Sequence, residues 1–576
     1  MDVTTRTGRI ERVSGPVVHI TGLTGAVRFE YVEVGDEHLP GEIISITRHR
    51  AVAQLYEYSG GLSVGEPAWG AGRPLSIELG PGLLGGIYDG LLRPLDDAGQ
   101  FLDRRGLARP TTTEHDFRPL ASEGSHIRQG EALGSLATTS GIEHLVLVPP
   151  GVGGRLDQIA EAGTHSSAAT IARIDGTPVA MTSQWPIRRA RPFSVRRGDR
   201  EPFVTGQRVL DILAPIARGG SATVIGGFGE GKTVLLEQLA KWGDADIIIF
   251  VGCGERGNEL ADLIDELSQL VDPRTSRRLL ERTVILANTS NMPVMAREAS
   301  IYTAITVAEY FRDMGHHAVI IADSTSRWAE ARRELASRTG AIPAEQGYPA
   351  DLPSSLSSFY QRAGRVTTLA ERDGTVTIVT SVSPPGGDVT EPVAAHTQRF
   401  VEAVWALDRD LAYARHYPAI SWRRSFSRDI DSVGHWHAAN GDPEWALRRD
   451  RLLAVLNEAE RLQGIADLVG LSGLPTEERL TLLSASLIGR TILQQSALSR
   501  NDASCSIAKQ AALVEAVLAV HDAAAALGRS GVPASVIEGV DFGPLIRAKD
   551  DTAADDAPAV RRMTSDLLAS LNRLAP

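Results

Sequence analysis

The sequence predicts a multidomain chain with an N-terminal β-barrel, a β-rich insertion, a central α/β domain and a C-terminal α-helical domain. Three observations support this fold class. The chain has 576 residues, and roughly three or four domains are expected at about 150 residues each. Short strand-like runs fill its first part, and strand and helix patterns alternate from residue 192. Helix formers dominate from residue 443.

The first two segments are assigned to residues 1–70 and 71–110. Residues 8–20, 27–34 and 42–58 are rich in Val, Ile and Tyr, and turns that contain glycine separate them. Several short strands at this spacing are typical of a small barrel. Residues 71–110 are rich in Gly and Leu but carry few structural signals, so they are treated as a connecting segment.

The third segment, residues 111–191, again favours β structure. Its clearest feature is the apolar run 144–149, which leads into Pro149-Pro150-Gly151-Val152-Gly153-Gly154. Such a cluster of Pro and Gly marks a turn. On the local pattern alone, an ordinary glycine-rich surface loop is as good an interpretation as a specific feature of a β-rich insertion.

The last two segments are residues 192–435 and 436–576. In the first, short apolar runs indicate buried strands, and amphipathic stretches at 234–242 and 298–314 lie between some of them. This alternation predicts a mostly parallel α/β sheet. The helical segment includes residues 445–466 and 511–527, and the polar stretch 550–558 is expected to be a loop. The five predicted strands of the sheet are residues 222–225, 247–251, 284–287, 318–322 and 376–379.

Composition excludes several classes of protein. The chain is 43% hydrophobic and 23% charged, with a net charge of −12, which is ordinary for a globular protein and unfavourable for general nucleic-acid binding. The two cysteines, Cys253 and Cys505, indicate no disulfide framework and fit a reducing cytoplasm. No signal peptide is recognised, and no apolar run approaches the ~20 residues that cross a bilayer. A role at a membrane is therefore expected to be peripheral.

The strongest chemical signal is a phosphate-binding loop (P-loop) between a predicted strand and a predicted helix. Lys232 is expected to reach the β- and γ-phosphates, and the Thr233 hydroxyl to bind Mg²⁺. Glycines let the backbone N–H groups turn toward the phosphates, and the helix that follows points its positive end at them. The matching residues are Gly226-Gly227-Phe228-Gly229-Glu230-Gly231-Lys232-Thr233.

Carboxylates follow two of the predicted strands. Glu255 comes after the run 247–251, where α/β sheets bind ligands, and suits the residue that positions the attacking water. Glu259 could support Mg²⁺-bound water. Spacing alone favours a surface charge for Glu255, but the P-loop upstream reverses that preference. Asp323 ends an apolar run of Walker B form and is expected to hold Mg²⁺, while Arg327 suits a phosphate contact and a salt bridge equally.

An aromatic residue lies near the end of the α/β segment, in the dipeptide Tyr417-Pro418. The proline makes a rigid turn, and the face of Tyr417 could stack on adenine. The residue pattern alone favours an ordinary packed tyrosine.

These motifs together resemble the catalytic A subunits of V/A-type rotary ATPases. Order and spacing agree from about residue 8 to the end. Residues 111–185 look like the insertion that marks A subunits and that F-type beta, non-catalytic B and flagellar export ATPases lack. Besides the P-loop, the matching segments are Val148-Pro149-Pro150-Gly151-Val152, Trp185-Pro186-Ile187-Arg188, Thr205-Gly206-Gln207-Arg208-Val209-Leu210-Asp211, Gly252-Cys253-Gly254-Glu255-Arg256-Gly257-Asn258-Glu259, Ala287-Asn288-Thr289-Ser290-Asn291-Met292-Pro293, Ala322-Asp323-Ser324-Thr325-Ser326-Arg327-Trp328 and Ser383-Pro384-Pro385-Gly386-Gly387-Asp388.

The resemblance implies a function and partners. Such a protein binds Mg²⁺ with ATP or ADP and interconverts ATP with ADP and phosphate, coupled to proton or sodium transport. It alternates with a non-catalytic B-type partner in a ring of three A and three B subunits. The ring carries central and peripheral stalks on the cytoplasmic side of a membrane and touches the membrane sector only indirectly. No nucleic-acid partner is expected.

The resemblance also implies roles for single residues. Glu255 corresponds to the carboxylate that activates water, and Arg256 and Glu259 are its neighbours in the site. Tyr417 matches the adenine-stacking aromatic residue. Leu498 stands where an adenine-contacting Phe is expected, so apolar contact survives without ring stacking.

Two further positions depart from the pattern. Glu230 occupies a place where the family usually has a small residue. A carboxylate beside a bound triphosphate is unfavourable unless it points outward or meets a cation. Arg428 resembles the finger arginine of B subunits, but F-type beta subunits carry a similar residue, so a structural role is favoured.

Two other functions remain open: a non-catalytic nucleotide-binding ring subunit, and a hexameric ATP-driven translocase or export ATPase. The intact pair of Lys232 and Glu255 argues against the first. A nucleic-acid translocase needs a basic surface that bears aromatic residues, whereas residues 8–58 are mixed in charge and lack an aromatic stack. The direction of the reaction and the transported ion are not set by this chain.

Overall fold

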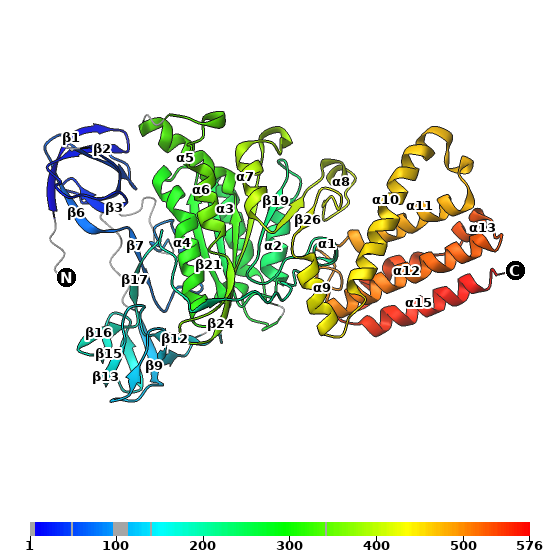
Figure 1. Cartoon of the computed structure of the whole chain (residues 1–576), viewed down its shortest axis with the longest axis horizontal. Helices are drawn as coiled ribbons and strands as arrows, with labels where there is room; N and C mark the ends of the chain where they lie inside the picture. The colour runs from blue at the N-terminus through cyan, green and yellow to red at the C-terminus, as the bar shows by residue number, and fades with distance from the viewer. Residues whose placement is uncertain are drawn as a thin grey trace. The chain divides into compact units, whose positions relative to one another are not determined.

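The computed structural model describes residues 6–47, 50–95, 113–138, 141–272, 274–339 and 342–575. The chain divides into two compact units. The first unit comprises residues 1–198, 218–223 and 245–401, and the second comprises residues 199–217, 224–244 and 402–576. The predicted barrel, β-rich insertion, α/β sheet and helical domain are all present (Figure 1).

The N-terminal part is a closed six-stranded barrel, as the run of short strands predicted. Val18, Val32 and Ile43 are fully buried in its aliphatic core. The predicted strand 8–20 is split by a turn at Gly15, whose φ is +58°. In spatial order the strands are β1 (Arg6–Ser14), β2 (Val17–Thr21), β5 (Arg50–Leu55), β4 (Leu39–Thr47), β3 (Glu30–Val34) and β6 (Pro67–Pro74).

The insertion consists of two four-stranded sheets, and each of its two apolar clusters contains residues from both sheets. The predicted Pro/Gly turn at 149–154 connects a strand of one sheet to a strand of the other. One sheet contains β10 (His126–Ile127), β13 (Gly154–Ile159), β15 (Thr170–Ile174) and β16 (Thr177–Ala180), and the other contains β12 (His144–Leu147), β11 (Ala132–Leu136), β9 (Glu114–Pro119) and β14 (Gly163–Ser166).

The α/β sheet contains all five strands predicted for it. Four of them and β8, a two-residue strand of the connecting segment, pair in parallel. Helix α4 packs against four of these strands. Strands of a parallel sheet are usually buried on both faces, which explains why their residues are mostly apolar. From β19 onward, the order is β19 (Ser221–Ile225), β24 (Asp373–Val382), β22 (His317–Asp323), β20 (Ile247–Glu255), β21 (Thr283–Thr289) and β8 (Ile87–Tyr88), and β23 (Gly364–Thr367) joins β24 to β18 (Val195–Arg196). The helices of this unit are α3 (Gly257–Gln269), α4 (Val294–Asp313), α5 (Thr325–Thr339), α6 (Leu352–Tyr360) and α7 (Pro392–Phe400).

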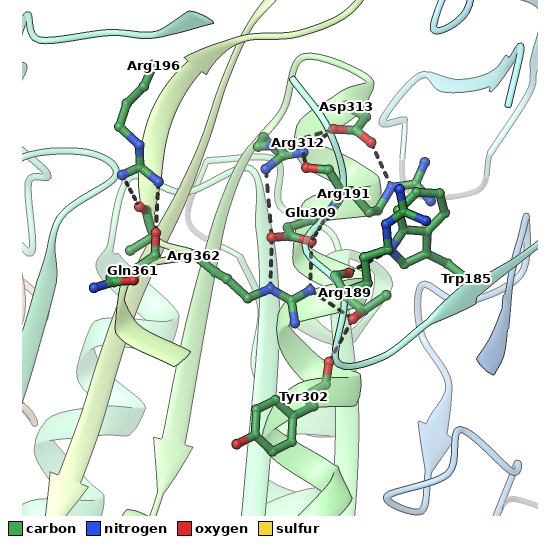
Figure 2. A network of polar contacts seen from close by, with 12 residues as sticks. Trp185, Arg189, Arg191, Arg196, Tyr302, Glu309, Arg312, Asp313, Gln361 and Arg362 are labelled. Carbon is green, nitrogen blue, oxygen red and sulfur yellow. Dashed lines mark hydrogen bonds and ion pairs between the residues drawn. The ribbon is translucent and has the colours of Figure 1, made fainter. Parts of the chain in front are cut away.

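The segment that follows the two sheets of the insertion, residues 183–191, is held against helix α4 by ion pairs and hydrogen bonds. It starts at β17 (Ser183–Pro186), which pairs with β7 (Ser76–Leu79). The buried Arg191 donates to Asp313 at 2.7 Å, and the partly buried Arg362 donates to Glu309 at 2.7 Å and to the carbonyl of Ile187 (Figure 2). Buried charges need such partners, so this network holds the segment beside helix α4.

The second unit begins with α1 and α2 and ends in a helical domain whose longer helices lie side by side (Figure 1). Helix α12 is the one helix in the described ranges long and apolar enough to cross a membrane, but half of its apolar window is buried, as in a core helix. Helices enter the predicted loop 550–558 from both sides, so only residues 552–556 lie between them. The elements are α1 (Arg208–Leu213), α2 (Lys232–Trp242), β25 (Ala403–Ala406), α8 (Arg409–Tyr413), β26 (Phe426–Ser427), α9 (Ile430–Ala439), α10 (Trp445–Val469), α11 (Thr476–Ile488), α12 (Ile507–Arg529), α13 (Ala534–Glu538), α14 (Gly543–Asp551) and α15 (Ala557–Asn572).

Candidate nucleotide site

The P-loop connects the end of β19 to the start of α2, as its sequence context predicted. Gly229 and Gly231 have φ values of +78° and +94°, a left-handed conformation that side chains disfavour. Gly231 directly precedes the first helical residue, Lys232. The free N–H groups of this first turn form an anion-binding end.

Lys232 is held by the loop itself. Its side chain is buried, and its ammonium group donates to the carbonyl of Gly226 at 2.9 Å and to the carbonyl of Gly227. Thr233 is exposed at the start of the helix, and Phe228 at the tip of the loop is 96% exposed. The loop therefore has the lysine in place and the threonine accessible.

Glu230 is turned toward the loop rather than away from it. Its carboxylate accepts the N–H of Gly227 at 2.7 Å. Gly227 belongs to the glycine-rich loop whose backbone N–H groups bind phosphates in P-loop proteins. A glutamate at position 230, where the family usually has a small residue, therefore occupies a backbone N–H group of the P-loop itself.

The two residues proposed for adenine lie on segments that are joined by a hydrogen bond. The N–H of Gln495 donates to the carbonyl of Tyr417 at 2.8 Å, and the Tyr417 side chain is 48% exposed. Leu498, three residues after Gln495, is 97% exposed. Both side chains are thus accessible to a ligand.

Arg208, which sequence analysis did not single out within its motif, positions the segment that carries Leu498. It is fully buried and donates to Asp502 at 2.5 Å and to the carbonyls of Ile492 and Gln494. Its own N–H donates to the side chain of Gln495. An arginine followed far along the chain by an acidic residue is too common a pattern to have revealed this link.

In the first unit, Glu255 is the last residue of β20. The register against β21 shifts between Cys253 and Glu255, which makes a bulge at Gly254, and bulges redirect the side chains beside them. Gly254 has φ +75°, and a β-carbon there would approach the β-carbon of Arg327 to 2.8 Å. Only glycine fits this position, so the sequence itself builds the bend that presents Glu255.

Charged neighbours surround this strand end. Arg256 lies 3.8 Å from Glu259, and both are exposed. Arg327 forms a salt bridge with Glu330 at 2.9 Å, one of the two roles that the sequence suggested for this arginine. That bond raises the pKa of Arg327, and the charges of Glu255 and Glu259 add to the effect against a smaller cost of burial. Arg327 thus lies within electrostatic range of both Glu255 and Glu259.

Asp323 ends β22, as predicted, and is buried. Ser381 of the adjacent strand β24 donates its hydroxyl to the Asp323 carboxylate, an orienting contact that a serine two residues beyond the predicted strand 376–379 could have indicated. Among the residues that the structure describes, no group of three or more His, Cys, Asp or Glu side chains could hold a metal by itself. Arg428 is exposed just after β26, and its N–H donates to the carbonyl of Glu402.

Three family models match the chain. Residues 206–427 match the nucleotide-binding domain of the ATP synthase alpha/beta family. Residues 108–188 match the barrel-sandwich domain of ATP synthase alpha/beta subunits, and residues 434–530 match the C-terminal domain of V and A type ATP synthases.

Among solved structures, the ATPase EscN of the type III secretion system of enteropathogenic E. coli is similar in fold. It has a TM-score of 0.63 and 22% identity over 89% of this chain and 100% of its own. At this identity the likeness concerns the fold alone.

Curated relatives that are named as the A subunits of A-type ATP synthases are much more similar. The protein of Staphylothermus marinus is 46% identical over 90% of this chain and 88% of its own length. The protein of Metallosphaera sedula is 44% identical over 98% of both chains, and that of Methanosarcina barkeri is 45% identical over 91% of this chain and 92% of its own. With this identity along nearly its whole length, the chain belongs to the A subunits of the A-type ATP synthases.

Proposed function

We propose that this chain is the catalytic subunit of a rotary ATP synthase or ATPase, which interconverts ATP with ADP and phosphate. The observation that carries the proposal is a complete P-loop with Lys232 in a chain that also presents Glu255 at the end of a buried strand. A site that only binds nucleotide does not need that carboxylate. The sequence resemblance assigns both residues to the same bound nucleotide.

The P-loop residues Gly226 to Thr233 are proposed to hold the phosphates. The N–H groups of the loop and the Lys232 ammonium balance phosphate charge. Tyr417 and Leu498 are proposed to contact adenine, consistent with their exposure.

The nucleotide is proposed to bind with Mg²⁺. The donor set fits a hard cation because hydroxyl and carboxylate oxygens are its preferred ligands. Thr233 and Asp323 would hold the ion, and Glu259 would orient its water. When bound, Mg²⁺ neutralises charge on the β- and γ-phosphates. Ser381 keeps the Asp323 carboxylate oriented.

Glu255 is proposed to position the attacking water and accept its proton. In hydrolysis, the water oxygen bonds to the γ-phosphorus while the bond to the bridging oxygen breaks, and ADP leaves with those electrons. Synthesis runs the same steps in reverse. Arg256 is assigned a supporting role beside Glu255.

The proposed partners are a B-type protein in an alternating ring, a central stalk and a peripheral stalk. The complex is placed on the cytoplasmic side of a membrane, where this chain meets the membrane sector only through other subunits. The names of the relatives support an ATP synthase complex.

The proposal is tested by Glu255→Gln in the assembled complex. Mg·ATP should still bind, but turnover should fall at least ~10²-fold because the positioned base is lost. Glu266→Gln is a matched control, since Glu266 is an exposed carboxylate on α3. Normal turnover in the Glu255→Gln complex would show that this residue does not activate water.

A further inference from the structure

The side chain of Glu230 contacts the P-loop backbone but has no role in the mechanism above, which uses only the backbone of this residue. We propose that its carboxylate is an internal competitor for the phosphates of the nucleotide, so that ATP or ADP must displace it from the P-loop. This inference rests on the proposed function of the loop. It assigns Glu230 a role in setting nucleotide affinity and product release.

The first argument is the geometry of the side chain. The Glu230 carboxylate accepts the N–H of Gly227 at 2.7 Å. A β-carbon built on Gly226 would lie 2.7 Å from one carboxylate oxygen, and one built on Gly227 would lie 2.6 Å from the other. The carboxylate therefore lies across both glycines and uses the space that their missing side chains leave.

The second argument is chemical likeness. A carboxylate and a phosphate are both anions that accept hydrogen bonds from backbone N–H groups through oxygen. Two anions at the same N–H group repel each other, and the repulsion grows as water is excluded. A phosphate that takes the N–H of Gly227 must therefore expel the Glu230 carboxylate.

The third argument is that a cation lies within electrostatic reach of the displaced carboxylate. Arg409 begins helix α8, and its guanidinium lies 5.0 Å from the ring centre of Tyr413. Its hydrogen bond to the Tyr413 hydroxyl raises the pKa of Arg409, and the charge of Glu230 contributes in the same direction. The field of the Glu230 carboxylate therefore already reaches Arg409, the first residue of helix α8.

The consequence for function is a weaker hold on the phosphates than a small residue at position 230 would allow. Part of the binding free energy of the nucleotide is spent on breaking the contact between Glu230 and Gly227. Re-formation of that contact then favours departure of ADP or phosphate. The effect acts on the phosphate end of the nucleotide and not on adenine.

The test compares the full chain with Glu230→Ala and Glu230→Gln by calorimetric titration of Mg·ADP and of adenosine. Glu230→Ala should bind Mg·ADP about tenfold more tightly, the size expected when one charged hydrogen bond no longer has to be broken. Glu230→Gln keeps an acceptor oxygen without the charge, so its gain should be smaller. Adenosine affinity should stay the same. The matched control Glu237→Gln, which removes the same charge farther along α2, should leave Mg·ADP affinity unchanged.

The outcomes separate this inference from the proposed function. Equal or weaker Mg·ADP binding by Glu230→Ala overturns the inference alone, as does a gain that Glu237→Gln reproduces, because the effect is then one of overall charge. Absence of Mg·ADP binding by both the unchanged chain and Glu230→Ala overturns the proposed function and the inference with it. Slower Mg·ADP release from Glu230→Ala in stopped-flow experiments supports competition.

Discussion

Lys232 shows how single residues prepare the P-loop for an anion. Its ammonium is buried, yet the carbonyls of Gly226 and Gly227 already accept its hydrogen bonds. A buried charge without partners would be costly. The loop therefore holds the positive charge in place, and a phosphate meets a cation whose position is already restricted.

Replacing this lysine should abolish tight nucleotide binding. Lys232→Ala removes the charge and its hydrogen bonds to the phosphates, and we expect Mg·ATP affinity to fall at least ~10²-fold. Isothermal titration calorimetry measures this. Lys241→Ala, near the other end of the same helix, is the control and should bind normally. If the Lys232→Ala chain keeps its affinity, the loop does not bind phosphate as proposed.

At the residue scale, the sequence predicted the positions of the charged groups better than their contacts. Lys232 follows a buried strand, Glu255 and Asp323 are the last residues of two others, and these strands end within four residues of the predicted bounds. The inward direction of Glu230 could not be predicted in this way. It depends on the Gly227 N–H group, which becomes available only when the loop has folded.

At the element scale, apolar runs identified the strands of the sheet because burial on both faces leaves little choice of residue. Strand β8, which lies in the connecting segment and is two residues long, was not predicted. Its pairing with β21 depends on tertiary contacts. The polar stretch 550–558 likewise resembled a loop, although helices α14 and α15 take up both of its ends.

The contact between strand β12 and helix α4 predicts a pH-dependent stability. His144 is buried and lies 3.0 Å from the Tyr310 hydroxyl. Burial lowers the pKa of His144 to about 3, and the nearby His316 and His115 contribute less. Between pH 6.5 and about 3, the unfolded chain binds a proton that the folded chain does not. The stability from neutral His144 is therefore present above pH 6.5 and is lost as the pH falls.

The variant His144→Gln should remove this dependence while keeping a polar group for Tyr310. Relative to the variant, the unchanged chain should lose about 2 kcal/mol of stability between pH 7 and pH 5. Scanning calorimetry of both proteins at the two pH values measures the change in their Tm difference. A Tm difference that stays constant would mean that His144 titrates normally. Other acid-sensitive groups are common to both proteins and cancel.

At the scale of the whole molecule, the order and spacing of the motifs are more informative about the family than any one motif is. The agreement in order and spacing along nearly all of the chain identifies the family, which no single motif could do. It does not set pairings such as β7 with β17, which join residues 76–79 to residues 183–186 across the whole insertion. Such contacts depend on how distant segments meet, and local patterns do not encode that.

The final prediction concerns the chain as part of an assembly: alone it should be a poor ATPase, and activity should appear with a B-type partner. The transition state spreads charge over three equatorial oxygens of the γ-phosphate. An arginine supplied from a neighbouring protein of the ring is commonly worth about 10³ to 10⁵ in rate. Arg256 is next to Glu255, but the family resemblance places the finger on the B-type partner.

Arg428 is the competing source of that arginine, since it is exposed and could act between copies of this chain. The two possibilities are separated by measuring turnover of the purified chain over a range of concentrations, and then after adding the B-type partner. We expect low turnover at every concentration and a large increase with the partner. Full turnover by the isolated chain, lost in Arg428→Ala, would contradict the heteromeric ring and support a ring of identical subunits. Because Arg428→Ala leaves the P-loop and Glu255 intact, loss of activity with unchanged Mg·ATP binding would identify the arginine itself as the missing group.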